Sequence, residues 1–290
     1  MIDPSLETPR PAQGAGFGDA VTFAFGAPDQ DVYGTARVGI VPGRPAHASG
    51  IVLLFHAGEV ASVSSEAVEL ETPDWRHVEA GDVTAAVVEP LRRWTVAYDG
   101  DGGAFELRFD ALGAPAELGR GALADSAAAI NGYEQLCRVR GTVRVGGRRL
   151  EVDCLGQRGH QWGAPDWRRL ELSRTLGVWL DDGRGVALAS VRPRGVDGHE
   201  RELIGAFLLD AEPVEIETPR LSTTLGDDGR QLRAGLELWL DDEHAPLHAA
   251  GEAVCGTTFD LGELRLDCAF FRWRMEGVGG VGRYDLLRRA

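Results

Sequence analysis

Short runs in which apolar and polar residues alternate recur along most of this chain, and turn residues separate them. Successive side chains of a strand point to opposite faces of a sheet, so this alternation is typical of strands with one buried face. Hairpin-type turn sequences, such as Gly146-Gly147 and Asp227-Asp-Gly229, lie between the runs. The runs include Val21–Phe25, Gly50–Phe55, Arg93–Tyr98, Ala104–Phe109, Glu134–Val145, Arg148–Asp153, Leu232–Leu240 and Leu264–Met275. We therefore expect antiparallel strands throughout.

Helical periodicity is nearly absent, and only Ala122–Ile130 predicts a short helix. Many evenly spaced strands with one brief helix indicate an all-β sandwich or barrel architecture. A length of 290 residues favours two such units, and Gly, Ala and Pro accumulate near 113–132, where a boundary fits best. We expect a flexible N-terminal arm at residues 1–18, an N-terminal β domain at 19–125 and a C-terminal β domain at 126–290.

Charge narrows the range of partners. The formal net charge is −15, which argues against a basic surface for nucleic acid or anionic membranes. All 30 basic residues are arginine, so Schiff-base and P-loop chemistry that needs a lysine is excluded. The N-terminus lacks a signal-peptide pattern, and no apolar run is long enough to span a membrane. We expect a cytoplasmic protein whose ligand is a hydrophobic small molecule.

Two sequence motifs resemble metal or cofactor sites, but the residues around them do not allow the structure that such a site needs. Gly277-Val-Gly-Gly-Val-Gly282 matches a dinucleotide fingerprint, but only eight residues follow it, too few for the helix that the site needs. His244 and His248 have helical ligand spacing, but Pro246 between them breaks such a helix. We expect neither a cofactor nor a metal.

The most informative segment is Gly156-Gln-Arg-Gly-His-Gln-Trp-Gly163. On a strand, Arg158, His160 and Trp162 share one face and Gln161 points to the other. A titratable imidazole, a guanidinium and an indole face can together move a proton and stabilise a developing cation. The alternative is that Trp162 is core and His160 is its hydrogen-bonded polar neighbour. We expect both side chains to face a cavity rather than solvent.

A second candidate is Tyr133-Glu134-Gln135, which opens a strand of mixed polarity. Glu134 is either an exposed acid paired with arginines or a cavity-facing acid. In the second case desolvation would raise its pKa and make it a proton donor.

These residues resemble those of a known superfamily. Tyr133-Glu134-Gln135, the run Gly141-Thr-Val-Arg-Val-Gly-Gly-Arg, His160-Gln-Trp-Gly163 and Asp166-Trp167 are similar to motifs of lipocalin-like, two-domain β proteins. That superfamily includes carotenoid 1,2-hydratase, AttH-like proteins, fungal decalin-forming Diels–Alderases and uncharacterised actinobacterial chains. The resemblance implies two packed lipocalin-like antiparallel β-barrel or sandwich domains that handle polyene or isoprenoid molecules.

The chain differs from that superfamily at two positions where the superfamily has an acidic residue. The usual form is Asp-His-x-Trp-Gly, and the aspartate position here is Gly159. Where the hydratases have a Tyr-x-Asp, this chain has Val186-Ala-Leu-Ala-Ser190. The resemblance therefore carries over His160 and Trp162 but not the acid, and Glu134 is the nearest replacement.

Three functions follow as hypotheses. The first is an enzyme that cyclises, isomerises or hydrates a hydrophobic, alkene-bearing terpenoid or polyene substrate by acid–base chemistry. The second is a non-catalytic carrier of apolar small molecules, and the third is a pericyclase-like template that uses no acid–base residue. The candidate catalytic residues are His160, Glu134 and Trp162. The candidate ligand-binding residues are Arg158, Tyr133, Trp167 and Trp179, with Arg158 orienting a polar group or keeping Glu134 ionised.

Overall fold

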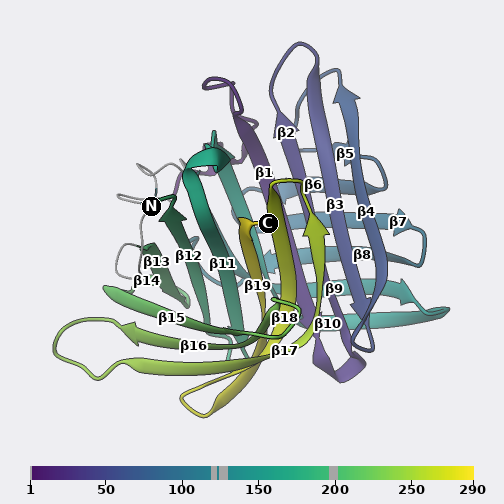
Figure 1. The fold of residues 1–290 in the computed structure, drawn as a ribbon. Coiled ribbons are helices and arrows are strands. Elements are labelled where there is room, and N and C mark those ends of the chain that lie inside the picture. Colours follow the sequence, from purple (N-terminus) through teal and green to yellow (C-terminus); the bar gives the residue numbers. More distant parts are fainter. Residues whose placement is uncertain (1, 119–122, 124–129, 196–201) are drawn as a thin grey trace. The chain divides into compact units, whose positions relative to one another are not determined.

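The computed structural model describes residues 2–118, 123, 130–195 and 202–290. It divides the chain into two compact units (Figure 1). The first unit comprises Met1–Glu117 and Ile130–Ala164, and the second comprises Leu118–Ala129 and Pro165–Ala290.

The first unit is a ten-stranded antiparallel sheet in the order β4-β3-β2-β1-β10-β9-β8-β7-β6-β5. Most neighbours are joined by hairpins, but β1 pairs with β10, which lies far away in the sequence. The strands are β1 (Gly18–Ala27), β2 (Val32–Val41), β3 (Ala46–His56), β4 (Glu59–Leu70), β5 (Val78–Ala80), β6 (Val83–Glu89), β7 (Arg93–Gly100), β8 (Gly103–Ala111), β9 (Ile130–Val145) and β10 (Arg148–Gly163).

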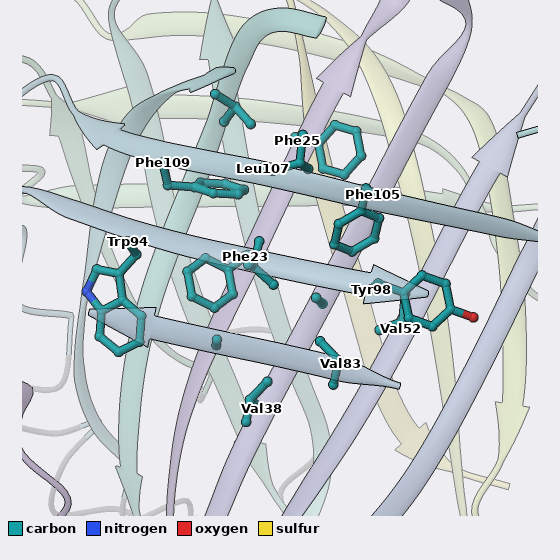
Figure 2. Packing of buried hydrophobic residues seen from close by; sticks show 14 of the residues in the cluster. Phe23, Phe25, Val38, Val52, Val83, Trp94, Tyr98, Phe105, Leu107 and Phe109 are labelled. Atoms are coloured by element: carbon teal, nitrogen blue, oxygen red, sulfur yellow. The ribbon is translucent and has the colours of Figure 1, made fainter. Parts of the chain in front are cut away.

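The sheet of the first unit curls around one hydrophobic core. Alternate residues of every long strand except β4 supply it, as strands with one buried face require. Figure 2 shows Phe23, Trp94, Phe105 and Phe109 among its large side chains, and the ring centroids of Phe23 and Phe109 are 5.1 Å apart. The curl brings β3 against β5: a Cβ at Gly50 would lie 2.4 Å from the Ala80 carbonyl oxygen, so only glycine fits there.

The second unit is a nine-stranded antiparallel sheet in the order β14-β13-β12-β11-β19-β18-β17-β16-β15. It encloses a core of its own that includes Leu176, Phe271 and Trp273. The strands are β11 (Leu170–Leu180), β12 (Gly185–Pro193), β13 (Leu203–Leu209), β14 (Val214–Glu215), β15 (Thr218–Leu225), β16 (Gln231–Trp239), β17 (Leu247–Asp260), β18 (Leu264–Met275) and β19 (Val278–Arg289).

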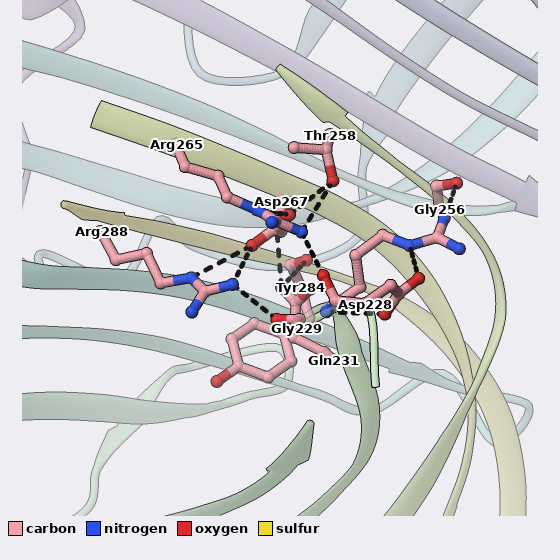
Figure 3. Close-up of polar contacts among 10 residues, drawn as sticks. Asp228, Gly229, Gln231, Gly256, Thr258, Arg265, Asp267, Tyr284 and Arg288 are labelled. Carbon is pink, nitrogen blue, oxygen red and sulfur yellow. Dashed lines mark hydrogen bonds and ion pairs between the residues drawn. The ribbon is translucent and has the colours of Figure 1, made fainter. Parts of the chain in front are cut away.

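A buried carboxylate, Asp267, ties several strands of the second unit together (Figure 3). It accepts hydrogen bonds from Thr258 at 2.6 Å and from Arg265 at 2.9 Å, and Arg288 lies 3.3 Å away. The same arginines reach the turn between β15 and β16 through the carbonyl oxygens of Asp228 and Gly229. These bonds satisfy the charge of Asp267, which gives the cluster a structural explanation.

The all-β prediction is confirmed: helix in the described residues is limited to three 3-10 turns, namely η1 (Pro4–Glu7), η2 (Pro28–Gln30) and η3 (Trp167–Arg169). The helix expected over 122–130 lies almost wholly outside the described residues. No helix in the described ranges is long and apolar enough to cross a membrane.

The sequence places a domain boundary between residues 125 and 126, which itself lies outside the described residues. The structure assigns β9 and β10 to the first unit, because β9 pairs with β8 and β10 pairs with β1. The segment expected to be a flexible arm also contributes to this unit. It contains η1, and the side chains of Glu7 and Phe17 are buried.

Candidate functional site

The central motif lies on β10, and its alternation is as expected. Arg158 and His160 point to the buried face of the sheet, with 2% and 0% of their surface exposed, and Trp162 follows at the half-buried end of the strand. The ring centroids of His160 and Trp162 are 5.5 Å apart. On the neighbouring strand β9, Tyr133 lies opposite His160 and Gln135 lies opposite Arg158, so both join the same face.

His160 is held by a carboxylate on one side and a phenol on the other. Its Nε2 lies 2.7 Å from Oδ1 of Asp19, which is on β1, and its Nδ1 lies 3.3 Å from the Tyr133 hydroxyl. Asp19 also accepts hydrogen bonds from Trp75 Nε1 at 3.2 Å and from the Arg10 backbone at 3.0 Å. Each ring nitrogen therefore faces an oxygen, an arrangement through which a proton can pass.

The network continues from Tyr133 to Glu7. The Tyr133 hydroxyl donates to Glu7 Oε1 at 2.7 Å, and Arg158 Nη1 lies 2.5 Å from the same oxygen. Trp94 Nε1 also donates to this carboxylate, at 3.1 Å, and the Leu91 backbone N–H donates to its second oxygen at 2.6 Å. Glu7 and Arg158 are thus a buried ion pair whose remaining polar atoms are hydrogen-bonded.

Gln135 supports this arrangement from behind. Its Oε1 accepts from Arg158 Nη2 at 2.7 Å, and its Nε2 donates to the carbonyl oxygens of Leu91 and Gly113, each at 2.8 Å. Leu91 has a φ of 59°, a left-handed conformation that costs a leucine about 1–2 kcal/mol. The amide side chain of Gln135 therefore fixes both the guanidinium and the strained turn that carries the Leu91 N–H.

Burial sets the electrostatics of the network. Desolvation raises the pKa of Tyr133 well above its ordinary value, and the Glu7 carboxylate adds to the effect while Arg158 opposes it. Tyr133 therefore remains a neutral phenol that donates to Glu7. Burial also lowers the pKa of Arg10, and the negative charge of Asp19 partly offsets this.

Aromatic rings enclose the polar groups. Trp75 packs edge-on against His160 with ring centroids 5.7 Å apart, and Trp94 packs edge-on against Trp75 at 5.9 Å. The guanidinium carbon of Arg10 lies 3.7 Å from the centroid of Trp162, which is a cation–π contact. His160 is thus packed against the rings of Trp75, Tyr133 and Trp162.

Glu134 does not join this set. It pairs with Gly159 in the register of β9 and β10 and therefore points to the other face of the sheet. There its carboxylate accepts from Gln157 Nε2 at 2.8 Å and from Gln161 Nε2 at 3.3 Å. The register therefore places Glu134 and Arg158 on opposite faces of the sheet, and the carboxylate paired with Arg158 is Glu7.

The position of Glu134 explains the glycine in the motif. A Cβ at Gly159 would lie 2.4 Å from Glu134 Oε1. The Glu134 carboxylate thus fills the space into which a side chain at 159 would extend. An aspartate at that position cannot coexist with Glu134 unless Glu134 moves.

Trp167 and Trp179 belong to the second unit and are not assembled with His160 within the first. Trp167 lies in η3, where its carbonyl oxygen accepts from Arg289 at 3.2 Å. Trp179 is buried on β11 and packs edge-on against Phe270.

The second unit has a polar cluster of its own. Arg174 pairs with Glu202, Ser190 contacts both residues, and Tyr284 lies 2.7 Å from Thr223 Oγ1. Ser190 thus lies beside the carboxylate of Glu202. Desolvation by burial raises the pKa of Tyr284.

Sequence reasoning missed Glu7, Asp19, Trp75 and Trp94. Asp19 carries a usable signal, since it shares the strand face of Val21 and Phe23 and is thus a polar residue at a core position. Glu7 carries none, because no periodicity marks its segment. Within the described residues, no group of three or more histidine, cysteine, aspartate or glutamate side chains is arranged to hold a metal.

Comparisons with known proteins agree with this architecture. The model of the family described as "Domain of unknown function (DUF7064)" matches residues 3–289. No curated protein matches the chain.

Several solved structures share the fold. An AttH-type protein from Nitrosomonas europaea superposes with a TM-score of 0.69 at 11% identity, covering 93% of this chain and 91% of its own. CghA in complex with Sch210972 gives 0.67 at 12% identity, with 95% and 89% covered. Kievitone hydratase from Nectria haematococca gives 0.58 at 11% identity, with 94% and 89% covered. At these identities the likeness shows the fold, which is the one that the sequence motifs imply.

Proposed function

The chain belongs to the DUF7064 family, and on that premise we propose that it is an enzyme for a hydrophobic, alkene-bearing substrate such as a terpenoid or polyene. The reaction would be an acid–base cyclisation, isomerisation or hydration. Two proteins of the same fold, one crystallised with Sch210972 and one named a hydratase, support a small-molecule reaction of this kind. Fold alone does not decide chemistry, so the argument rests on the site.

The observation that carries the proposal is the hydrogen-bonded chain from Asp19 through His160 to Tyr133. An imidazole between a carboxylate and a phenol can accept a proton from one side and deliver one on the other. The carboxylate fixes the orientation of the ring, as the third group of a catalytic triad does. In this proposal His160 is the proton-transfer group and Asp19 is its positioning residue.

Trp162 supplies the second requirement, which is stabilisation of positive charge. Its ring already binds a cation, since the Arg10 guanidinium carbon lies 3.7 Å from its centroid. A carbocation formed by protonating an alkene would be attracted to the same face. Because Arg10 covers that face, the substrate would have to displace the segment that carries Arg10.

A carrier function is the second candidate, and one observation favours it. His160 is completely buried, and its nitrogens and those of Arg158 already have partners inside the unit. A network satisfied in this way also stabilises a fold without any chemistry. In a carrier, the same network would only shape the wall of an apolar binding site.

Solvent isotope exchange on the natural ligand distinguishes the two functions. The apolar molecule that co-purifies with the protein is extracted, identified by mass spectrometry and returned to the enzyme in D2O. An enzyme incorporates deuterium at carbon, and His160→Gln lowers that rate by about 10²–10⁴ while ligand affinity is kept. His77→Gln is the matched control, because His77 is exposed and pairs only with the exposed Glu79 among its described contacts.

Trp162 is tested in the same assay. Trp162→Phe should reduce the rate less than Trp162→Leu does, because phenylalanine retains a weaker π-face and leucine has none. An unchanged ligand mass with wild-type protein would reject the enzyme and favour the carrier. Normal turnover by a folded His160→Gln variant would show that His160 is not the proton-transfer group. Glu134→Gln would then be the next variant to test.

A further inference from the structure

The carboxylate of Glu7 lies in a set of donors that the sheet of the first unit builds without it. We call this set the carboxylate cradle. Its members are Arg158 Nη1, the Tyr133 hydroxyl, Trp94 Nε1 and the backbone N–H of Leu91, at 2.5, 2.7, 3.1 and 2.6 Å from Glu7. They come from β10, β9, β7 and the turn before β7. Convergence of one cation and three neutral donors on a single point is the geometry of an anion site.

The cradle has its own support, independent of Glu7. Gln135 binds both Arg158 and the Leu91 carbonyl oxygen, and so it holds the cation and the strained turn together. A leucine held in a left-handed conformation so that its N–H faces a ligand position is the type of strain that accompanies binding sites. Gln135 thus holds two of the four donors by contacts that do not involve Glu7.

Only the carboxylate comes from outside the sheet. Glu7 ends the single turn η1, whose other hydrogen bonds are internal: Asp3 accepts from the Ser5 N–H, and Thr8 donates to the Ser5 carbonyl. Beyond this turn the segment is also held at Arg10, whose N–H donates to Asp19 and whose guanidinium lies over Trp162. The segment carries few apolar anchors, although Ile2 is buried. The segment before β1 contains no strand, so it can leave the cradle without unpairing any strand of the sheet.

We infer that the carboxylate cradle binds the carboxylate of an amphipathic, apolar acid, and that Glu7 occupies the cradle in place of this ligand. A buried Arg158 needs an anion at all times, which either carboxylate supplies. The inference rests on the proposed function, because it assigns a carboxylate to the hydrophobic substrate of the same site. The apolar part of the ligand would take the space that the segment carrying Glu7 vacates.

Fluorescence titration with cis-parinaric acid, a polyene carboxylic acid, tests the inference, with its methyl ester as the uncharged probe. Removal of the competing carboxylate in Glu7→Ala should tighten binding of the acid by at least about tenfold more than binding of the ester, which is 1.4 kcal/mol. The double variant Glu7→Ala/Arg158→Gln should lose the preference for the acid. Glu151→Ala, which removes an exposed carboxylate paired with Arg149, should bind both probes as wild type does.

A second measurement applies even if Glu7→Ala unfolds easily. Sodium acetate should raise the Tm of Glu7→Ala by several degrees more than sodium chloride of equal ionic strength does, because acetate fills the cradle. Wild type and Glu7→Ala/Arg158→Gln should show no such difference.

The outcomes separate this inference from the proposed function. Equal affinity for acid and ester in every variant would overturn the carboxylate site and leave an apolar binding site in place. A folded Glu7→Ala that binds neither probe and gains nothing from acetate would also overturn it. Failure of deuterium incorporation with the co-purified ligand would reject catalysis, while the preference of Glu7→Ala for the acid would stand.

Discussion

Asp19 Oδ1 and His160 Nε2 lie 2.7 Å apart, across the pairing of β1 with β10, and both side chains are completely buried. In the register of the two strands Asp19 faces Trp162 and His160 faces Val21, so the contact is diagonal. Long side chains bridge such diagonal neighbours. The pair therefore joins two strands whose residues are far apart in the sequence, and it fixes the ring on which the proposed proton transfer depends.

Asp19→Asn should destabilise the protein by about 2–3 kcal/mol, because a single amide oxygen replaces a carboxylate that accepts from His160, Trp75 and Arg10. Urea unfolding measures this change. The matched control is Glu79→Gln, which weakens an exposed pair with His77 and should change stability by less than about 1 kcal/mol. Equal effects of the two variants would mean that the buried pair contributes no more than a surface pair.

Glu7 and Arg158 should show strong coupling in a double-mutant cycle. Glu7→Gln or Arg158→Met alone leaves an uncompensated buried charge and should cost about 3–5 kcal/mol. The double variant removes both charges and should cost less than the sum by about 0.5–3 kcal/mol. The same cycle at Arg149 and Glu151, whose side chains are largely exposed, provides the comparison. Additive effects at the buried pair would contradict its burial.

Alkaline pH should weaken the fold through Cys137. Burial raises the pKa of its thiol to about 12, although the nearby Arg158 lowers it in part. Between an unfolded value of about 8.5 and the folded one, the folded state binds a proton that the unfolded state has lost. Stability is therefore complete below pH 8.5 and falls by about 1.4 kcal/mol per pH unit above it.

The variant Cys137→Ala separates this effect from general alkaline unfolding. Its cavity lowers stability at every pH, but its free energy of unfolding should fall less steeply than that of wild type above pH 9. Denaturant melts at intervals from pH 7 to pH 11 give both slopes. Parallel curves would show that the Cys137 thiol has an ordinary pKa.

Gly159→Asp should cost about 1–3 kcal/mol, because its Cβ would lie 2.4 Å from Glu134 Oε1 and displace the buried carboxylate from its hydrogen bonds with Gln157 and Gln161. The exchange Gly159→Asp/Glu134→Gly moves the carboxylate from β9 to β10 and should recover most of the loss. Thermal melts measure both variants. Gly18→Asp is the control, since nothing lies within 4 Å of a Cβ at Gly18. A double variant no better than Gly159→Asp would show that the two positions do not share one space.

Alternation along the chain was enough to predict the class of fold and the shared face of Arg158, His160 and Trp162. It could not predict which residues meet there. Asp19 reaches His160 only because β1 pairs with β10. The alternation of apolar and polar residues within a strand does not reveal which other strand it pairs with. Glu134 shows the same limit: a shift of one position along β9 separates it from Tyr133 and places it on the other face.

The N-terminal segment shows a different limit. Its prolines and glycines predict an arm without regular structure, and over residues 2–17 the structure assigns the single turn η1. Its largest polar contribution is the side chain of Glu7, whose place is set by the charge of Arg158 and not by local pattern. An ion pair with a residue on a distant strand, such as that between Glu7 and Arg158, produces no periodic pattern in the sequence from which it could be predicted.

The pairing of β1 with β10 also governs how the first unit is made. During synthesis β1 to β4 can form hairpins as soon as they leave the ribosome, but one edge of β1 waits for a partner that is translated more than a hundred residues later. An exposed edge with buried-face residues such as Val21 and Phe23 invites pairing with other chains during that interval. The last strand of the unit to be translated is thus the one that protects the first, and it carries His160 into contact with Asp19 at the same moment.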